Sequence, residues 1–200
     1  MSRTPAQEIR ALYRQVDGFD IPRSEEKDVA KSGGDPLYGE LTPGGAATMI
    51  QKLELGPRDV FYDLGSGSGK VVLQVAMTLP VKRCVGYELS ETRCRQARSR
   101  LLAARKKGLV QAKRCAFYPR DLMSAPMDDA TVIYTCSTAF SNRFMRRLMQ
   151  RLLHLPAPVT LATLRDLDDH KRFELVDCHT VATNWERRSP LFVYRVTPRP

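Results

Sequence analysis

Short apolar runs alternate along the chain with longer segments in which apolar residues recur every three or four positions. The short runs predict buried strands, and the longer segments predict helices that cover them. The runs predicted as strands are 60–63, 81–88, 111–118, 131–136, 158–164, 172–178 and 191–197. The segments predicted as helices are 5–16, 43–54, 71–78, 90–107 and 142–154, and the polar segment 17–36 is predicted as loop. Seven strands with helices between the early ones predict an α/β fold with a mostly parallel sheet and helices on both faces.

Three glycines lie between the apolar run 60–63 and the helical segment 71–78. Gly65, Gly67 and Gly69 allow the backbone to turn sharply and to approach a ligand closely, because glycine carries no Cβ. The first N–H groups of the following helix point back at the turn. The segment therefore predicts a ligand-binding site at the end of the first buried strand.

The spacing of these glycines separates three kinds of site. A phosphate-binding P-loop would need a glycine at Leu64 and a hydroxyl side chain at Val71. A dinucleotide fingerprint would need a glycine at Lys70. The remaining pattern, D-x-G-x-G-x-G from Asp63 to Gly69, is typical of methyltransferases with a Rossmann-like fold and indicates S-adenosyl-L-methionine as the cofactor.

Two carboxylates follow predicted strands at positions that suit this cofactor. Glu88 ends the second strand, which is expected to end beside the glycine turn. A carboxylate there can accept hydrogen bonds from both ribose hydroxyls. Asp121 follows the third strand, where it is placed either to accept a hydrogen bond from the adenine amino group or to stabilise a turn.

The composition limits the cellular compartments and the partners that we expect for this protein. The five cysteines form no C-x-x-C pair, so no metal site is predicted and the thiols are expected to be reduced. No apolar run approaches the roughly 18 residues that span a bilayer, and no apolar segment follows the N-terminus. We therefore expect an intracellular protein without a membrane partner, located in the cytoplasm or, in a eukaryote, in the nucleus.

The net charge of +10 makes a polyanionic partner plausible. Segment 90–107 is rich in basic residues and has no acidic residue after Glu91. This pattern indicates either a solvated helix face or a surface that contacts nucleic acid or a nucleoprotein. Both interpretations stay open on the sequence. The cations assigned to this surface are Arg93, Arg95, Arg98, Arg100, Lys106 and Lys107.

Three stretches together resemble one known family. The sequences LYGE at 37–40, FYDLGSGSGKVVLQVA at 61–76 and GYE at 86–88 are similar to the disruptor-of-telomeric-silencing family, the histone lysine methyltransferases that lack a SET domain. The resemblance covers about residues 37–141 and continues faintly to Trp185. After the fourth strand the family has two asparagines and then an aromatic residue, Ala and Phe, of which this chain keeps Ala139 and Phe140.

The resemblance implies a class I methyltransferase fold and a division of the chain. Residues 1–42 would form an N-terminal helix and a loop that covers the cofactor, and residues 43–200 would form the methyltransferase domain. Phe140, Trp185 and Tyr38 would act at the acceptor lysine, with Phe192 as a further wall of the channel. The residues implied to bind the cofactor are Tyr38, Gly39, Glu40, Asp63, Gly65, Ser66, Gly67, Gly69, Glu88, Leu89, Asp121 and Leu122.

The function predicted on these grounds is methylation of a lysine on a protein, histone-like or part of another nucleoprotein. A lysine has a pKa near 10.4 and attacks only when neutral, so a narrow aromatic channel would assist by disfavouring the ammonium. Two alternatives stay open: an RNA or DNA methyltransferase, and a non-catalytic module that binds cofactor or nucleic acid. The Asn/Asp-Pro-Pro-aromatic motif typical of base-amino methylation is missing after the fourth strand.

Overall fold

The computed structural model of the protein describes residues 3–16, 18, 21–33, 39–167 and 171–199. In this part of the chain seven strands form one sheet in the order β3-β2-β1-β4-β5-β7-β6. Strands β1 to β5 run parallel, and β7 pairs antiparallel with both β5 and β6. The strands are β1 Val60–Leu64, β2 Arg83–Glu88, β3 Cys115–Pro119, β4 Val132–Thr135, β5 Val159–Thr163, β6 Phe173–Val181 and β7 Ser189–Val196.

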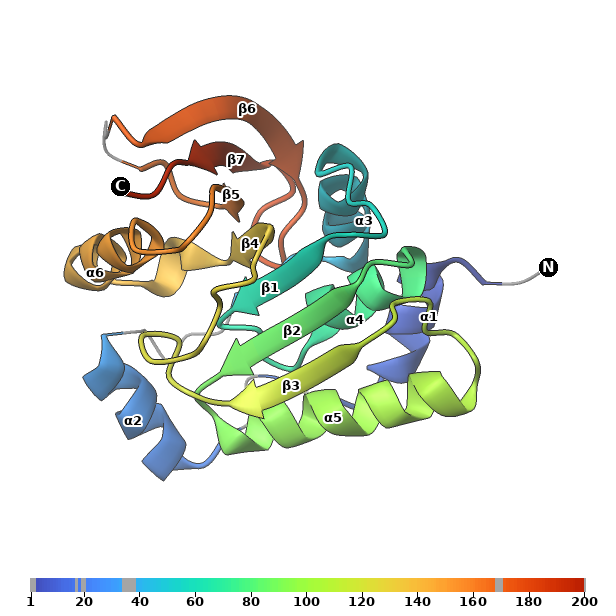
Figure 1. The fold of residues 1–200 in the computed structure, drawn as a ribbon. Coiled ribbons are helices and arrows are strands. Elements are labelled where there is room, and N and C mark those ends of the chain that lie inside the picture. The colour runs from blue at the N-terminus through green and yellow to red at the C-terminus, as the bar shows by residue number, and fades with distance from the viewer. Residues whose placement is uncertain (1–2, 17, 19–20, 34–38, 168–170, 200) are drawn as a thin grey trace.

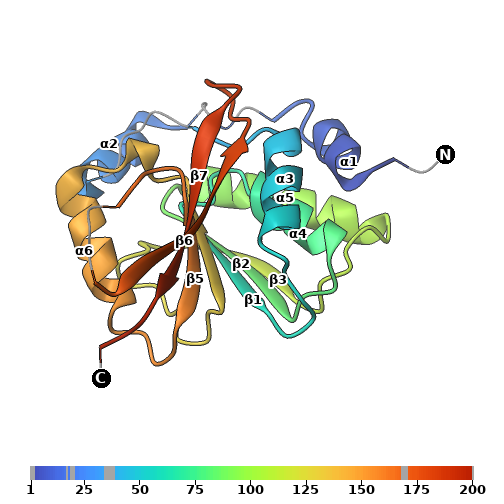
Figure 2. The ribbon, with the colours of Figure 1, turned by 90° about the horizontal axis from the view of Figure 1, so that it is seen from above.

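Helices cover both faces of this sheet, as Figures 1 and 2 show. Helices α1, α3, α4 and α5 lie on one face, and α6 lies on the other. The described helices are α1 Pro5–Leu12, α2 Arg23–Ser32, α3 Pro43–Lys52, α4 Lys70–Thr78, α5 Glu91–Lys106 and α6 Asn142–Leu152, with a 3-10 turn η1 at Ser137–Ala139. The predicted α/β fold with a mostly parallel sheet is confirmed. None of the described helices is both long and apolar enough to cross a membrane.

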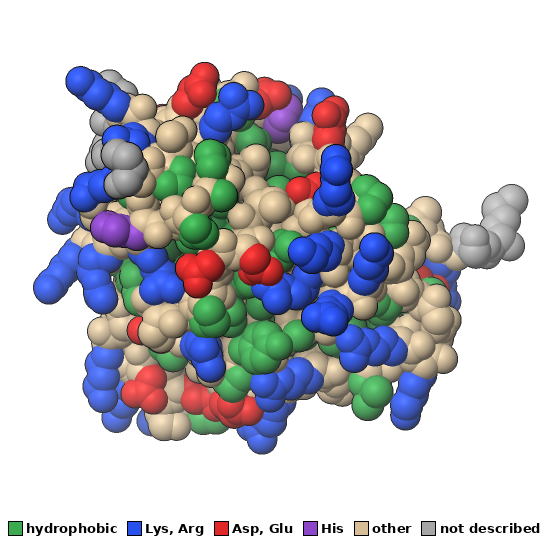
Figure 3. All heavy atoms as spheres, viewed as in Figure 1, with side chains coloured by type: hydrophobic (Ala, Val, Ile, Leu, Met, Phe, Trp, Pro, Cys, Tyr) green, Lys and Arg blue, Asp and Glu red, His purple; other side chains and the backbone are tan. Residues whose placement is uncertain are grey.

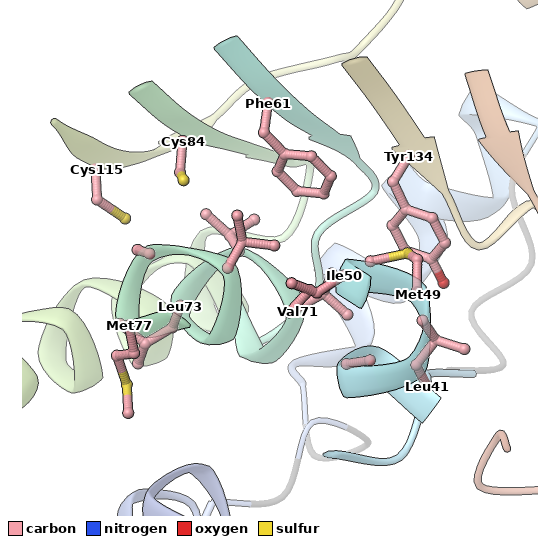
Figure 4. Close-up of a cluster of buried hydrophobic side chains, with 14 of the residues drawn as sticks. Leu41, Met49, Ile50, Phe61, Val71, Leu73, Met77, Cys84, Cys115 and Tyr134 are labelled. Atoms are coloured by element: carbon pink, nitrogen blue, oxygen red, sulfur yellow. The ribbon is translucent and has the colours of Figure 1, made fainter. Parts of the chain in front are cut away.

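The buried side chains form one cluster on each face of the sheet. Figure 4 shows part of the first cluster, in which Phe61 of β1 and Tyr134 of β4 lie among side chains of α3 and α4. Strand β1 is buried at every position because both of its faces are covered. The end of β1 is therefore held firmly where the ligand-binding turn begins.

Helix α2 shows that the predicted loop over 17–36 was wrong in part. Glu25 and Glu26 lie in its first turn, where a carboxylate suits the helix dipole, and Gly33 ends it with a φ of 95°. The helix buries none of its side chains, so its sequence carries no apolar periodicity. That missing pattern is the reason why the sequence did not predict this helix.

Strand β3 begins at Cys115, four residues later than the predicted strand 111–118. The backbone amides of Gln111 and Ala112 donate to the carbonyl oxygen of Ala76, over 2.8 and 3.0 Å. These bonds tie the segment to the end of α4 and keep it out of the β2 ladder. The outer edge of β3 is then capped by α5, because Arg98 and Arg105 donate to the carbonyl oxygens of Phe117 and Cys115.

Candidate active site

The glycine turn connects β1 to α4 in backbone conformations that favour glycine. Gly65, Gly67 and Gly69 have φ angles of 83°, 53° and 84°. The amides of Gly65 and Ser66 both donate to the carbonyl oxygen of Tyr87 at 2.9 Å, which joins the turn to the end of β2. A Cβ on Gly69 would lie 2.6 Å from the Cβ of Ala97, so α5 packs closely against the turn.

Glu88 holds the turn in place through its carboxylate. Its Oε2 accepts from the amide of Gly67 at 2.8 Å, and its Oε1 accepts from the amide of Ser90 at 2.9 Å. The Arg93 guanidinium lies 3.9 Å from Oε1. Burial raises the pKa of Glu88 above its ordinary value, although these hydrogen bonds and the arginine oppose the shift. Sequence reasoning missed this positioning of the turn, since it assigned Glu88 to the ribose alone.

Asp63 is the second buried carboxylate at this end of the sheet. Its side chain is 2% exposed, and its Oδ1 accepts no hydrogen bond from the described residues. Burial and the nearby charge of Glu88 raise the pKa of Asp63 well above its ordinary value. The Oγ of Ser66 is likewise buried without a partner among the described residues. These atoms are available to a polar ligand.

Two adjoining cavities open beside these carboxylates and share Gly39, Gly65 and Cys136 in their walls. The predicted residues that line the first cavity are Gly39, Gly65, Glu88, Leu89, Asp121, Leu122 and Phe140. Those that line the second are Gly39, Glu40, Asp63, Gly65 and Ser66. Gly67 and Gly69 shape the turn behind these walls. Tyr38 lies outside the described residues.

The segment that leads into α3 is attached to the loop between β6 and β7. Leu41 forms a bridge with Thr183, and the amide of Asn184 donates to the carbonyl oxygen of Glu40 at 3.0 Å. The Glu40 carboxylate also pairs with Lys70 at the start of α4. These contacts hold Gly39 and Glu40 beside the glycine turn, where both line the second cavity.

Two of the aromatic residues predicted at the acceptor, Phe140 and Trp185, lie in different surroundings. Phe140 lines the first cavity, and its ring packs against Phe144 with centroids 4.6 Å apart. A Cβ on Gly65 would lie 3.3 Å from the tip of the Phe140 ring, so the two positions face each other. Trp185 is 48% exposed and packs on Gly39, where a Cβ would lie 2.5 Å from its ring. Trp185 is not part of either cavity wall among the described residues.

Asp121 takes part in a turn and also lines the first cavity. Its Oδ1 accepts from the amide of Met123 at 2.8 Å. Arg151 of α6 supports the same loop by donating to the carbonyl oxygens of Met123 and Ala125. Both roles considered for Asp121 on the sequence are therefore compatible with its position.

Arg93 corrects the predicted basic surface, because it is buried. It is 4% exposed, lines the first cavity and donates to the carbonyl oxygen of Gly18 at 2.8 Å. Its spacing from Ala97 and Leu101 places it on the buried side of α5, and this signal was readable in the sequence. Sequence reasoning also missed Val29 and Ser32 of α2, which line the same cavity.

The other predicted cations of α5 divide into two groups. Arg98 and Arg100 donate to backbone carbonyl oxygens, those of Phe117 and Leu12, and so hold neighbouring elements. Arg95, Lys106 and Lys107 are exposed. The predicted contact with nucleic acid stays a prediction for these exposed residues.

The strand order, the reversed last strand and the glycine turn define a class I methyltransferase fold, the Rossmann-like fold of S-adenosylmethionine-dependent enzymes. Two solved structures with this fold are similar at low sequence identity. An RNA methyltransferase from Salinibacter ruber has a TM-score of 0.59 at 22% identity, over 78% of this chain and 92% of that one. A magnesium protoporphyrin IX methyltransferase from Synechocystis has a TM-score of 0.60 at 11% identity, over 98% of this chain and 99% of that one.

The chain belongs to the family described as "Histone methylation protein DOT1", whose model matches residues 19–186. A relative in Caenorhabditis elegans, named "Histone-lysine N-methyltransferase, H3 lysine-79 specific", is 31% identical over 71% of this chain and 16% of its own length. A relative of the same name in Aspergillus fumigatus is 29% identical over 72% of this chain and 30% of its own length. The family resemblance predicted from the sequence is confirmed. The match spans less than a third of the length of either relative.

Proposed function

We propose that this protein transfers a methyl group from S-adenosylmethionine to a lysine side chain of a protein, a histone or another component of a nucleoprotein. The observation that carries the proposal is the pair of cavities around the glycine turn and the two buried carboxylates, in a chain of this family. The names of the relatives support a histone lysine as the acceptor. A nuclear location in a eukaryote would agree with such a substrate.

The residues around the turn fit the proposed cofactor. Gly65 leaves room beside the Phe140 ring that a Cβ would reduce, and the buried Oδ1 of Asp63 offers an acceptor. We assign Asp63, Gly65 and Ser66 to the methionine end, Glu88 to the ribose and Asp121 with Leu122 to the adenine. Glu88 can serve both the turn and a ribose because each carboxylate oxygen accepts more than one hydrogen bond.

The chemistry that S-adenosylmethionine supplies when bound is an electrophilic methyl group on a sulfonium, whose leaving group is neutral. The protein must therefore present a neutral lysine in line with that methyl group. We assign Phe140 to the wall of the lysine channel, since its ring borders the cavity at Gly65. An apolar wall lowers the pKa of a lysine by desolvation and so raises the fraction that can attack.

The outer part of the channel is assigned to the segment that precedes α3 and to the loop after β6. Trp185 would form the rim, because it packs on Gly39 at the mouth of the site. Phe192 of β7 and Tyr38 remain further predictions for this channel. We also propose that residues 1–42 form an N-terminal helix and a loop that covers the cofactor, and that residues 43–200 form the methyltransferase domain.

Methylation of a protein by the purified chain is the test of this function. The protein would be incubated with tritium-labelled S-adenosylmethionine and, separately, histones, reconstituted nucleosomes and cell extract. We expect label in a protein band that survives nuclease and disappears with protease. Label removed by nuclease would instead identify an RNA or DNA methyltransferase. Absence of label in every sample, with or without nucleic acid, would end the proposal.

Arg151 offers a separate check on the adenine side of the site. Arg151→Met should weaken cofactor binding about tenfold, a loss of about 1.4 kcal/mol, because the loop that carries Asp121 and Leu122 would lose its anchor. Isothermal calorimetry with S-adenosylmethionine measures this change. Arg147→Met is the matched control, since Arg147 lies on the same helix and is exposed. Equal affinities for both variants would contradict the assignment of this loop.

A further inference from the structure

Helix α6 presents an array of cations on its exposed side. Arg143, Arg146, Arg147 and Arg151 line a shallow hollow of about 450 Å³ together with Met123 and Gln150. We call these six residues the α6 arginine surface. The chain has no aspartate or glutamate between Asp129 and Asp166, so no acidic residue of this helix balances them. Figure 3 shows basic side chains gathered over α6, at the left of the view.

The hydrogen bonds of the arginines distinguish α6 from α5. On α5, four arginines donate to backbone carbonyl oxygens, so their charge serves the packing of neighbouring elements. These arginines are Arg93, Arg98, Arg100 and Arg105. On α6, Arg151 also donates to backbone carbonyl oxygens. Arg143, Arg146 and Arg147, however, are exposed and form no hydrogen bond or ion pair with the residues that the structure describes. Like charges four residues apart destabilise a helix slightly, and for these three arginines no contact within the described protein offsets that cost.

The hollow also lacks the apolar anchors that protein partners require. A specific protein interface has an apolar core, with aromatic residues enriched there. The large exposed hydrophobic residues of the described chain all lie outside α6, and Met123 is the apolar member of the hollow. Guanidinium groups bind phosphates through paired hydrogen bonds, and a phosphodiester backbone offers many phosphates without an apolar surface. We propose that the α6 arginine surface binds the phosphodiester backbone of nucleic acid.

The position of α6 connects this surface to the candidate active site. The helix begins at Asn142, two residues after Phe140, and its Phe144 packs on the Phe140 ring. Nucleic acid bound along α6 would therefore hold an attached protein close to the proposed lysine channel. This consequence rests on the proposed methyltransferase function, whereas binding of nucleic acid itself does not.

The test measures binding without any methyl transfer. A short fluorescein-labelled DNA duplex is titrated with the protein by fluorescence anisotropy at salt concentrations from about 50 to about 200 mM. We expect Arg143→Gln/Arg146→Gln/Arg147→Gln to weaken binding at least tenfold. The slope of log affinity against log salt should become shallower by about 3, because each lost phosphate contact contributes about 0.9. Arg151 is left in place because it supports the loop around Asp121.

The matched control removes three exposed charges from the opposite end of the sheet, near the starts of β1 and β2, as Lys52→Gln/Arg58→Gln/Lys82→Gln. We expect this variant to retain at least half of the affinity and most of the salt slope. An equal or larger loss in the control variant, or no binding of DNA by the unchanged protein, would overturn the proposal. Displacement of DNA by poly-glutamate at equal charge concentration would overturn it in favour of an acidic protein partner. Circular dichroism and thermal melting of each variant verify that the fold is retained.

Discussion

Arginine in place of Gly65 is expected to abolish binding of S-adenosylmethionine. Gly65 lies in the wall that the two cavities share, and its φ of 83° is one that other residues adopt only at a cost. Even a Cβ would reach within 3.3 Å of the Phe140 ring, so a longer side chain must enter the cavities or displace that ring. We expect a loss of affinity of at least about 100-fold in isothermal calorimetry, about 2.7 kcal/mol.

Gly108→Arg provides the matched control for this substitution. Gly108 ends α5 with a φ of 65°, so an arginine there meets a comparable backbone penalty. A Cβ at Gly108 would meet no atom within 4 Å, and the residue lies outside both cavity walls. Cofactor affinity should therefore be unchanged in this control. If Gly65→Arg is poorly folded, Gly65→Ala serves instead, with a smaller but measurable loss. Unchanged affinity in folded Gly65 variants would remove the turn from the cofactor site.

The structural features that the sequence predicted correctly are those fixed by backbone geometry. Glycine spacing identified the turn at Gly65, Gly67 and Gly69, because no other residue adopts these φ angles as easily. The parallel order of β1 and β2 then brought Glu88 to the turn, since the ends of neighbouring parallel strands lie together. These features are local or follow from a single strand pairing, so the spacing of residues along the sequence is enough to predict them.

The parts that the sequence did not predict depend on side-chain partners distant in the chain. Helix α2 has no apolar face, and its Glu25 accepts from the side chain of Thr92 at 2.8 Å, a contact that no periodicity reveals. Arg93 was counted by its charge, although its place among Ala97 and Leu101 put it on the buried side. A helical-wheel projection of α5 would have placed this arginine with the buried residues and apart from the exposed cations.

Asp63→Asn is expected to stabilise the protein at neutral pH and to weaken cofactor binding. Burial and the charge of Glu88 raise the pKa of Asp63, so the folded protein retains a proton that the unfolded chain has already released. The stability associated with this proton is complete below the ordinary pKa of an aspartate. It is lost as the pH rises through the higher pKa of the folded state. Asparagine cannot ionise, so the variant avoids this loss.

Thermal melting should therefore give Asp63→Asn a higher melting temperature than the unchanged protein at neutral pH. In acid the two melting temperatures should be equal. We expect a gain of about 1 kcal/mol or more at neutral pH, since an ionised carboxylate that is buried without a partner is costly. Calorimetry should show at least about tenfold weaker binding of S-adenosylmethionine, because the amide keeps one acceptor oxygen but puts an NH2 donor in place of the other at the proposed methionine end. Asp128→Asn, at an exposed position, controls for the change in net charge. A variant that is destabilised yet binds cofactor normally would make Asp63 a structural residue rather than a ligand-binding one.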